Sequence, residues 1–230
     1  MLDLLLTEKS LQRILEKGDL KMFENYKVYE TTIAGRPFRL ETGKMAGLAN
    51  AAFMASYGET NVLCTVTASA KPREGVDFFP LSVDFEEKMY SVGRFPGSFQ
   101  RREGKASEKA ILSSRCIDRP IRPLFPKDMR NDCSVVATVM SVDPDCSPEI
   151  TAAIGVSAAI AVSDIPWDGP IASTSVGLVD GEIVINPTLE QRAVTDLTLT
   201  VSSTVDLVAM IEAGGNEIPD DLMFDCIMAG

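Results

Sequence analysis

The sequence predicts an α+β fold in which helices pack against a mixed β-sheet. Strand-forming and helix-forming segments follow one another without the strict alternation that a parallel α/β sheet requires. Several strand-forming segments are separated only by tight-turn residues, which indicates antiparallel pairing. Of the 230 residues, 45% are hydrophobic, so the chain can bury a substantial core.

Segments in the first half of the chain are typical of strands. Residues 25–41 predict two strands around a turn at 34–37, and residues 51–69 predict a hairpin that turns at 58–61. The sequence LSVDFEE at 81–87 alternates apolar and polar side chains, as in a strand with one solvent-facing side.

A loop and a helix are predicted next. Residues 90–104 contain three glycines and one proline, which favours a loop. Residues 106–118 predict a helix that Ser107 caps and that Pro120 and Pro123 end. The buried face of this helix is expected to carry Ala110, Ile111, Ser114 and Ile117.

The second half of the chain adds elements of both kinds. Residues 148–163 are apolar and rich in small residues, which predicts a helix, begun by Pro148, that packs closely on a sheet. Asp180-Gly181 is a favoured hairpin turn. The other predicted elements are strands at 133–142 and 197–203 and a helix at 219–230. We predict one core domain over residues 22–230, preceded by an extension at 1–21 outside it.

Histidine is absent from the chain, and the five cysteines include no CxxC pair. The chain therefore cannot use Ser/His/Asp or Cys/His nucleophilic catalysis, or a histidine-ligated metal. The cysteines are expected to be buried reduced thiols, which are typical of a cytoplasmic protein. No apolar run approaches the roughly 20 residues that span a bilayer, so no membrane partner is expected.

The net charge of −11 is distributed unevenly. Residues 94–130 contain ten basic and four acidic residues, whereas residues 131–230 contain one basic residue, Arg192, and sixteen acidic ones. A basic segment inside an acidic chain is typical of a surface that binds phosphate groups. Seven of the ten cations are arginine, which pairs bidentately with phosphate oxygens. A solvated basic helix face balanced by the acidic half is the alternative.

The run RREGKASEKAILSSRCIDRPIRPLFP at 101–126 is long and unusual. Together with FFPLSVDFEEKMYSVGRFPGSFQ before it and VMSVDPDCSPEITAAIGVSAA after it, it resembles the first RNase PH-like core of bacterial polynucleotide phosphorylases. The resemblance implies that the chain is part of a longer protein. In that family three protomers form a ring around a channel for RNA. Inorganic phosphate attacks the 3′-terminal phosphodiester in the second core, a divalent metal assists, and nucleoside diphosphates are released.

The resemblance implies RNA-binding residues in the basic segment. Residues 98–102 are similar to the family's channel loop, in which Phe99 would stack on any base and Arg101 and Arg102 would hold the backbone. Gln100 belongs to the same loop, at a position where relatives often have a second aromatic residue. Three further RNA-binding candidates, for which a structural role in the IDRPIRP segment is the alternative, are Arg115, Arg119 and Arg122.

The family's catalytic core binds phosphate through serines before a helix and holds its metal through two acids six residues apart. At the matching place here only Ser147 remains, because Pro148 lacks an amide donor and Glu149 adds a negative charge. At about 4 Å and an effective dielectric near 20, that charge would repel a phosphate charge by roughly 4 kcal/mol. We therefore expect neither a catalytic residue nor a phosphate site in this core. Its metal candidates are Glu190 and Asp196, with exposed surface acids as the alternative.

These inferences predict a division of labour. This core would bind single-stranded RNA and build a homotrimeric ring, while a second core binds inorganic phosphate and Mg²⁺ and performs the reaction. The whole protein is expected in the cytoplasm, where RNA-degradation assemblies are possible partners. The alternatives are a stand-alone RNase PH-type exonuclease, a non-catalytic RNA-binding or scaffold subunit, and a small-molecule kinase of related fold.

Overall fold

The first of two sheets is mixed and six-stranded. The computed structural model describes residues 23, 25–97 and 99–230, so the extension predicted at 1–21 lies outside the described residues. The strands of the first sheet are β1 (Lys27–Ile33), β2 (Arg36–Thr42), β3 (Ala51–Tyr57), β4 (Thr60–Pro72), β5 (Leu81–Glu87) and β6 (Asn131–Ser141). Their order is β1-β2-β3-β4-β6-β5. Only β5 and β6 run parallel, through a β-α-β crossover, so the predicted mixed sheet is confirmed.

The second sheet is antiparallel and four-stranded, in the order β10-β9-β7-β8. Its strands are β7 (Ala172–Val179), β8 (Glu182–Ile185), β9 (Leu197–Ser203) and β10 (Val208–Gly215). The α-helices are α2 (Glu108–Ile121), α3 (Pro148–Val162), α4 (Leu189–Val194) and α5 (Asp220–Ala229), and the 3-10 helices are η1 (Met89–Val92) and η2 (Arg122–Leu124).

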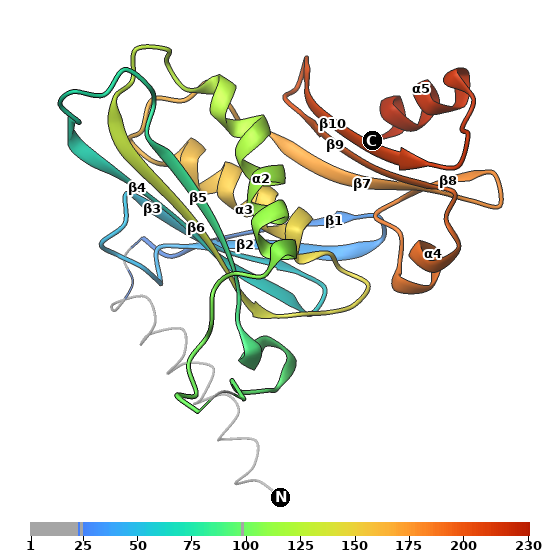
Figure 1. The fold of residues 1–230 in the computed structure, drawn as a ribbon, viewed down its shortest axis with the longest axis horizontal. Helices are drawn as coiled ribbons and strands as arrows, with labels where there is room; N and C mark the ends of the chain where they lie inside the picture. Colours follow the sequence, from blue (N-terminus) through green and yellow to red (C-terminus); the bar gives the residue numbers. More distant parts are fainter. Residues whose placement is uncertain (1–22, 24, 98) are drawn as a thin grey trace, which may run out of the picture.

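Helices α2 and α3 lie between the two sheets (Figure 1). Helix α3 contacts β3 and β4 on one side and β7 on the other, while α2 contacts β5 and β10. Helix α5 packs on the opposite face of the second sheet. This layered arrangement confirms the α+β class. No helix in the described part of the chain is long and apolar enough to cross a membrane.

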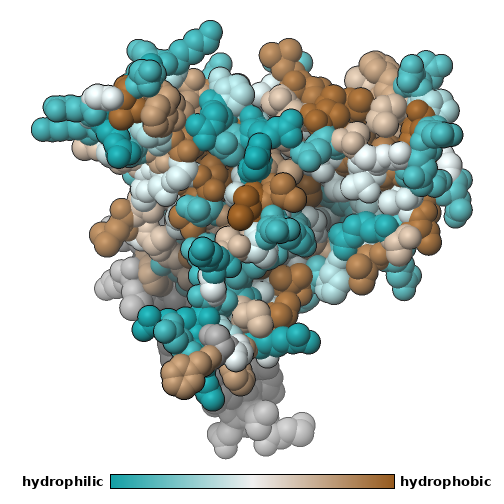
Figure 2. All heavy atoms as spheres, viewed as in Figure 1, coloured by the Kyte–Doolittle hydropathy of each residue, from teal (hydrophilic) through white to brown (hydrophobic). Residues whose placement is uncertain are grey.

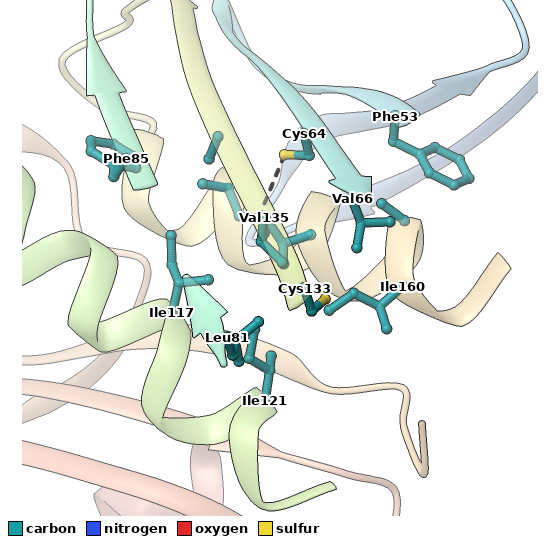
Figure 3. Packing of buried hydrophobic residues seen from close by; sticks show 14 of the residues in the cluster. Phe53, Cys64, Val66, Leu81, Phe85, Ile117, Ile121, Cys133, Val135 and Ile160 are labelled. Carbon is teal, nitrogen blue, oxygen red and sulfur yellow. Dashed lines mark hydrogen bonds between the residues drawn. The ribbon is translucent and has the colours of Figure 1, made fainter. Parts of the chain in front are cut away.

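The main core fills the space between the first sheet and these two helices. In Figure 3, Ile121 of α2 lies beside Leu81 of β5, while Ile160 of α3 lies beside Cys133 of β6. All these side chains are buried. The five cysteines are free, and only Cys116 is incompletely buried, in agreement with the predicted reduced thiols.

The tight turns form where the sequence predicts them. Ala34 and Gly35 join β1 to β2 with φ angles of 47° and 74°, and Asp180 and Gly181 join β7 to β8 with 51° and 80°. Positive φ at both central residues is the requirement of a type I′ turn, whose twist suits a two-residue hairpin.

The end predicted for the helix at 106–118 is wrong. Helix α2 continues through Pro120 to Ile121. Pro120 lies in the last turn, where its missing N–H costs a single hydrogen bond, and its ring is buried. The predicted buried face is also partly wrong, because Ile111 is exposed and Ser113 is buried.

Candidate nucleic-acid interface

Four of the predicted RNA-binding residues lie in a loop that joins η1 to α2, at the lower end of the molecule in Figure 1. Contacts at both ends fix this loop. The Ser107 hydroxyl accepts a hydrogen bond from the Ala110 N–H at 3.0 Å, as predicted for a helix cap, and donates one to Glu87 at 2.7 Å. The Glu103 carboxylate accepts a hydrogen bond from the Met89 N–H at 2.9 Å. The segment between these contacts therefore projects from an anchored base.

The tip of the loop is exposed and combines aromatic with cationic side chains. Phe99 is fully exposed, and Gln100, Arg101 and Arg102 are exposed beside it. Figure 2 shows hydrophobic and hydrophilic residues side by side over this end of the molecule. The sequence analysis missed Phe95, which is 73% exposed. Its position in a glycine-rich, basic loop was the available signal. The predicted loop also included Ser98, which lies outside the described residues.

Arg101 holds an unusual position at this tip. Its guanidinium carbon lies 5.9 Å from the centre of the Phe95 ring, which is within the range of a cation–π contact. Its φ of 49° is a left-handed conformation that costs a non-glycine residue about 1 kcal/mol. Backbone strain of this kind concentrates at binding and catalytic sites.

The other three arginine candidates differ in their partners. Arg122 forms a bidentate pair with Asp118, at 2.8 and 3.1 Å, and donates a further hydrogen bond to the Leu81 carbonyl at 3.0 Å. Arg119 pairs with Glu212 of β10 at 3.0 Å. Arg115 is exposed and forms no ion pair within the described ranges. Arg122 therefore ties the end of α2 to the start of β5, and Arg119 ties α2 to the second sheet.

The N-terminus of α3, which corresponds to the predicted degenerate phosphate site, is occupied by the chain's own groups. Ser147 caps the helix by accepting a hydrogen bond from the Ile150 N–H at 3.3 Å, and Pro148 is the first helical residue. The Glu149 carboxylate accepts a hydrogen bond from the Ser147 hydroxyl at 2.8 Å and pairs with Lys109 of α2 at 3.1 Å. A negative side chain already complements the positive end of the helix dipole there.

These contacts set the charge of Glu149. Burial alone would raise the pKa of this carboxyl, but the Ser147 hydroxyl, the residue's own amide and the Lys109 ammonium outweigh burial and lower the pKa. Glu149 is therefore ionised at neutral pH, and its charge opposes a second anion at this place.

A cavity of about 230 Å³ lies beside the same helix end, between α2, α3 and the second sheet. Its wall on the sheet side is made of hydroxyl groups, because β7 and β9 pair in a register that places Ser173 opposite Ser202 and Ser175 opposite Thr200. The Ser173 and Ser202 hydroxyls form a hydrogen bond with each other at 2.7 Å. The cavity therefore combines neutral hydroxyls with the Lys109–Glu149 pair.

The two metal candidates lie at the surface, in the segment that runs from α4 to β9. Glu190 lies on the first turn of α4 and Asp196 directly precedes β9, and both are exposed. Across the described part of the chain, no three acidic or cysteine side chains come together as a metal would require.

The chain is similar in sequence to proteins named polyribonucleotide nucleotidyltransferase. The chain is 61% identical to the polyribonucleotide nucleotidyltransferase of Lachnoclostridium phytofermentans over 204 residues, which cover 89% of this chain and 29% of the relative. It is 58% identical over 205 residues to the protein of the same name from Ruminiclostridium cellulolyticum, with the same two shares. The chain thus spans less than a third of the length of these relatives.

Solved structures and family models agree on the fold. Rice (Oryza sativa) Rrp46 superposes with a TM-score of 0.65 at 15% identity, covering 88% of this chain and 86% of Rrp46, a likeness that shows the fold alone. Domain 2 of the 3′ exoribonuclease family (RNase PH) matches residues 169–230, which contain the second sheet. Domain 1 of that family matches residues 34–166, more than half of the sequence. The chain therefore belongs to the 3′ exoribonuclease family.

Proposed function

We propose that this chain is the RNA-binding core of a polynucleotide phosphorylase. The whole protein would be a cytoplasmic enzyme that degrades single-stranded RNA from its 3′ end and releases nucleoside diphosphates. A second core would bind inorganic phosphate and Mg²⁺ and perform the reaction, and three protomers would form the ring. The family membership and the names of the relatives support the reaction class. The reduced, mostly buried cysteines support the cytoplasm.

The exposed loop carries the proposal for this core. Single-stranded RNA is bound without sequence preference where aromatic rings stack on bases and cations follow the backbone. Phe99, Arg101 and Arg102 present both kinds of group at one tip. A processive exonuclease needs this combination, since it must hold every sequence that passes. The ionised Glu149 at the α3 N-terminus supports placing phosphorolysis elsewhere.

The test of RNA binding is the double substitution Arg101→Ala with Arg102→Ala. The slope of log affinity against log salt is negative, and each lost phosphate contact reduces its magnitude by about 0.7 for a single strand. The loss of two contacts should therefore reduce the magnitude by about 1.4. Binding should weaken alike for oligoadenylate and oligouridylate. A matched control removes two cations elsewhere, Lys27→Ala with Lys71→Ala, both exposed on the first sheet. An unchanged slope in the loop variant would show that the loop does not hold RNA.

The test of the division of labour is a phosphorolysis assay. The purified chain is incubated with single-stranded RNA, inorganic phosphate and Mg²⁺, and the products are analysed for nucleoside diphosphates. We expect none from this chain alone. Release of diphosphates would show that this core is itself catalytic, and Glu190 and Asp196 would then become the first residues to substitute.

A further inference from the structure

We propose that Phe95 is a second base-stacking residue of the RNA-binding loop, paired with Arg101, an inference that rests on the function proposed above. The two together would present a flat ring for one base and a positive charge for the adjoining phosphate. The resemblance to the family's channel loop covers residues 98–102 and does not include Phe95.

The exposure of Phe95 is the first argument. A phenylalanine that anchors a loop turns its ring inward, yet Phe95 is 73% exposed. A cavity of about 530 Å³ does lie beneath the loop, lined by its neighbours Pro96 and Gly97 and by Arg102, but Phe95 does not line it. The ring is therefore not part of the packing under the loop, and most of its surface can meet a ligand.

The contact with Arg101 is the second argument. The guanidinium carbon lies 5.9 Å from the Phe95 ring centre, while Arg101 keeps a left-handed backbone conformation. A guanidinium that leans on a ring is partly ordered before RNA arrives, so less side-chain freedom is lost on binding. Its N–H donors are also left for phosphate oxygens, because Arg101 forms no ion pair within residues 23, 25–97 and 99–230.

The composition of the tip is the third argument. Phe99 supplies one fully exposed ring, and its neighbour Gln100 has no aromatic face. Among the described residues of the loop, Phe95 is therefore the one other ring available for a base. Arg94, Arg101, Arg102 and Lys105 surround the two rings in sequence, which makes a polyanion with aromatic bases the complementary ligand.

The experiment separates stacking from backbone contact. The full chain with Phe95→Ala is titrated into two labelled oligomers of equal length, oligoadenylate and an abasic ribose-phosphate chain, and binding is followed by fluorescence anisotropy. Loss of one stacked base weakens binding about 5- to 150-fold. We expect a loss of this size for oligoadenylate and no change for the abasic oligomer, with binding restored in Phe95→Trp but not in Phe95→Leu. Phe78→Ala, at another exposed phenylalanine between β4 and β5, should change neither affinity.

Two results would overturn the inference. Equal binding of oligoadenylate by wild type and Phe95→Ala would show that no base stacks on this ring. An equal loss for both oligomers would show that Phe95 only orients Arg101. If instead the double Arg101/Arg102 variant binds RNA as wild type does, the proposed function itself fails, so the two failures are distinguishable.

Discussion

Replacing Gly155 with alanine should destabilise the protein, although alanine is the better helix former. Gly155 lies in α3, where the helix crosses β3 and β4. A Cβ atom at this position would lie 2.7 Å from the Cys64 sulfur and 2.8 Å from the Ala55 Cβ atom. Both neighbours are completely buried, so neither can move into solvent.

The magnitude follows from two opposing effects. A glycine-to-alanine change inside a helix gains about 1 kcal/mol of propensity. Optimal contacts between such atoms are about 3.5–4.0 Å, so the new methyl would be roughly 1 Å too close to two neighbours. Overpacking of a core costs about 1–3 kcal/mol. With two short contacts the cost lies toward the upper end, and we expect a net loss of about 1–2 kcal/mol.

Urea unfolding followed by circular dichroism measures this difference. Gly214→Ala in β10 is the matched control, because no described atom lies within 4 Å of its Cβ position. That control should be neutral or slightly stabilising. Adding Cys64→Ala to Gly155→Ala should recover part of the loss by removing the sulfur contact. A Gly155→Ala protein that is more stable than wild type by about 1 kcal/mol would refute the close approach of α3 to the sheet.

Two further predictions concern the helix ends beside the candidate sites. Because contacts lower the pKa of Glu149, its stabilising contribution is present above the unfolded pKa, about 4.3, and is lost as pH falls through the folded pKa. Glu149→Gln should therefore lower the melting temperature at pH 7 and flatten the decline below about pH 4; parallel pH curves for both proteins would contradict this. Ser107→Ala should cost about 1 kcal/mol in urea unfolding through loss of the α2 cap. Ser114→Ala, inside the same helix, should cost much less. Equal losses for the two variants would show that the Ser107 cap does not stabilise the protein.

Local chemistry made much of the fold predictable. Asp180-Gly181 and the Gly58 turn required backbone conformations that few residues adopt, so both hairpins could be placed from sequence. The strand at 81–87 has the bounds that its alternation predicts. Pro148 begins α3 as expected, since proline suits the first turn of a helix.

The missed elements are short or lie at an edge, and their local signals are weaker. Strand β10 is an edge strand in which only Met210 is buried, so its side chains need not alternate. Helix α4 has six residues and depends on a capping box between Thr188 and Gln191, and on a hydrogen bond from the Leu189 N–H to Asp145 at 2.8 Å. The Thr188–Gln191 capping box is a local signature of a helix start that the prediction overlooked. The contact with Asp145 joins residues far apart in the chain and leaves no period in the sequence.

The same reason limited the prediction of the site. The loop could be located because its glycines, aromatics and arginines are neighbours in sequence. The partners of Arg119 and Lys109 could not, because Glu212 and Glu149 approach them only through tertiary packing. The ten cations of the basic segment can be counted from the sequence. The cations that stabilise the fold cannot be distinguished there from those that remain available to bind a ligand.

The contacts of the acidic residues near the loop determine which cations remain available to bind a polyanion. Glu103 accepts the Met89 N–H, Glu86 pairs with Lys88 at 2.8 Å, and Glu87 accepts the Ser107 hydroxyl. These carboxylates are engaged at the anchored base of the loop rather than with the arginines of its tip. Exposed charges more than about 8 Å away are largely screened at physiological salt. Residues 94–105 contain four basic residues and one acidic residue, so a polyanion that meets the tip encounters local positive charge even though the chain as a whole carries −11. Net charge is for this reason a poor guide to the ligand, and the positions of the few neighbouring carboxylates are a better one.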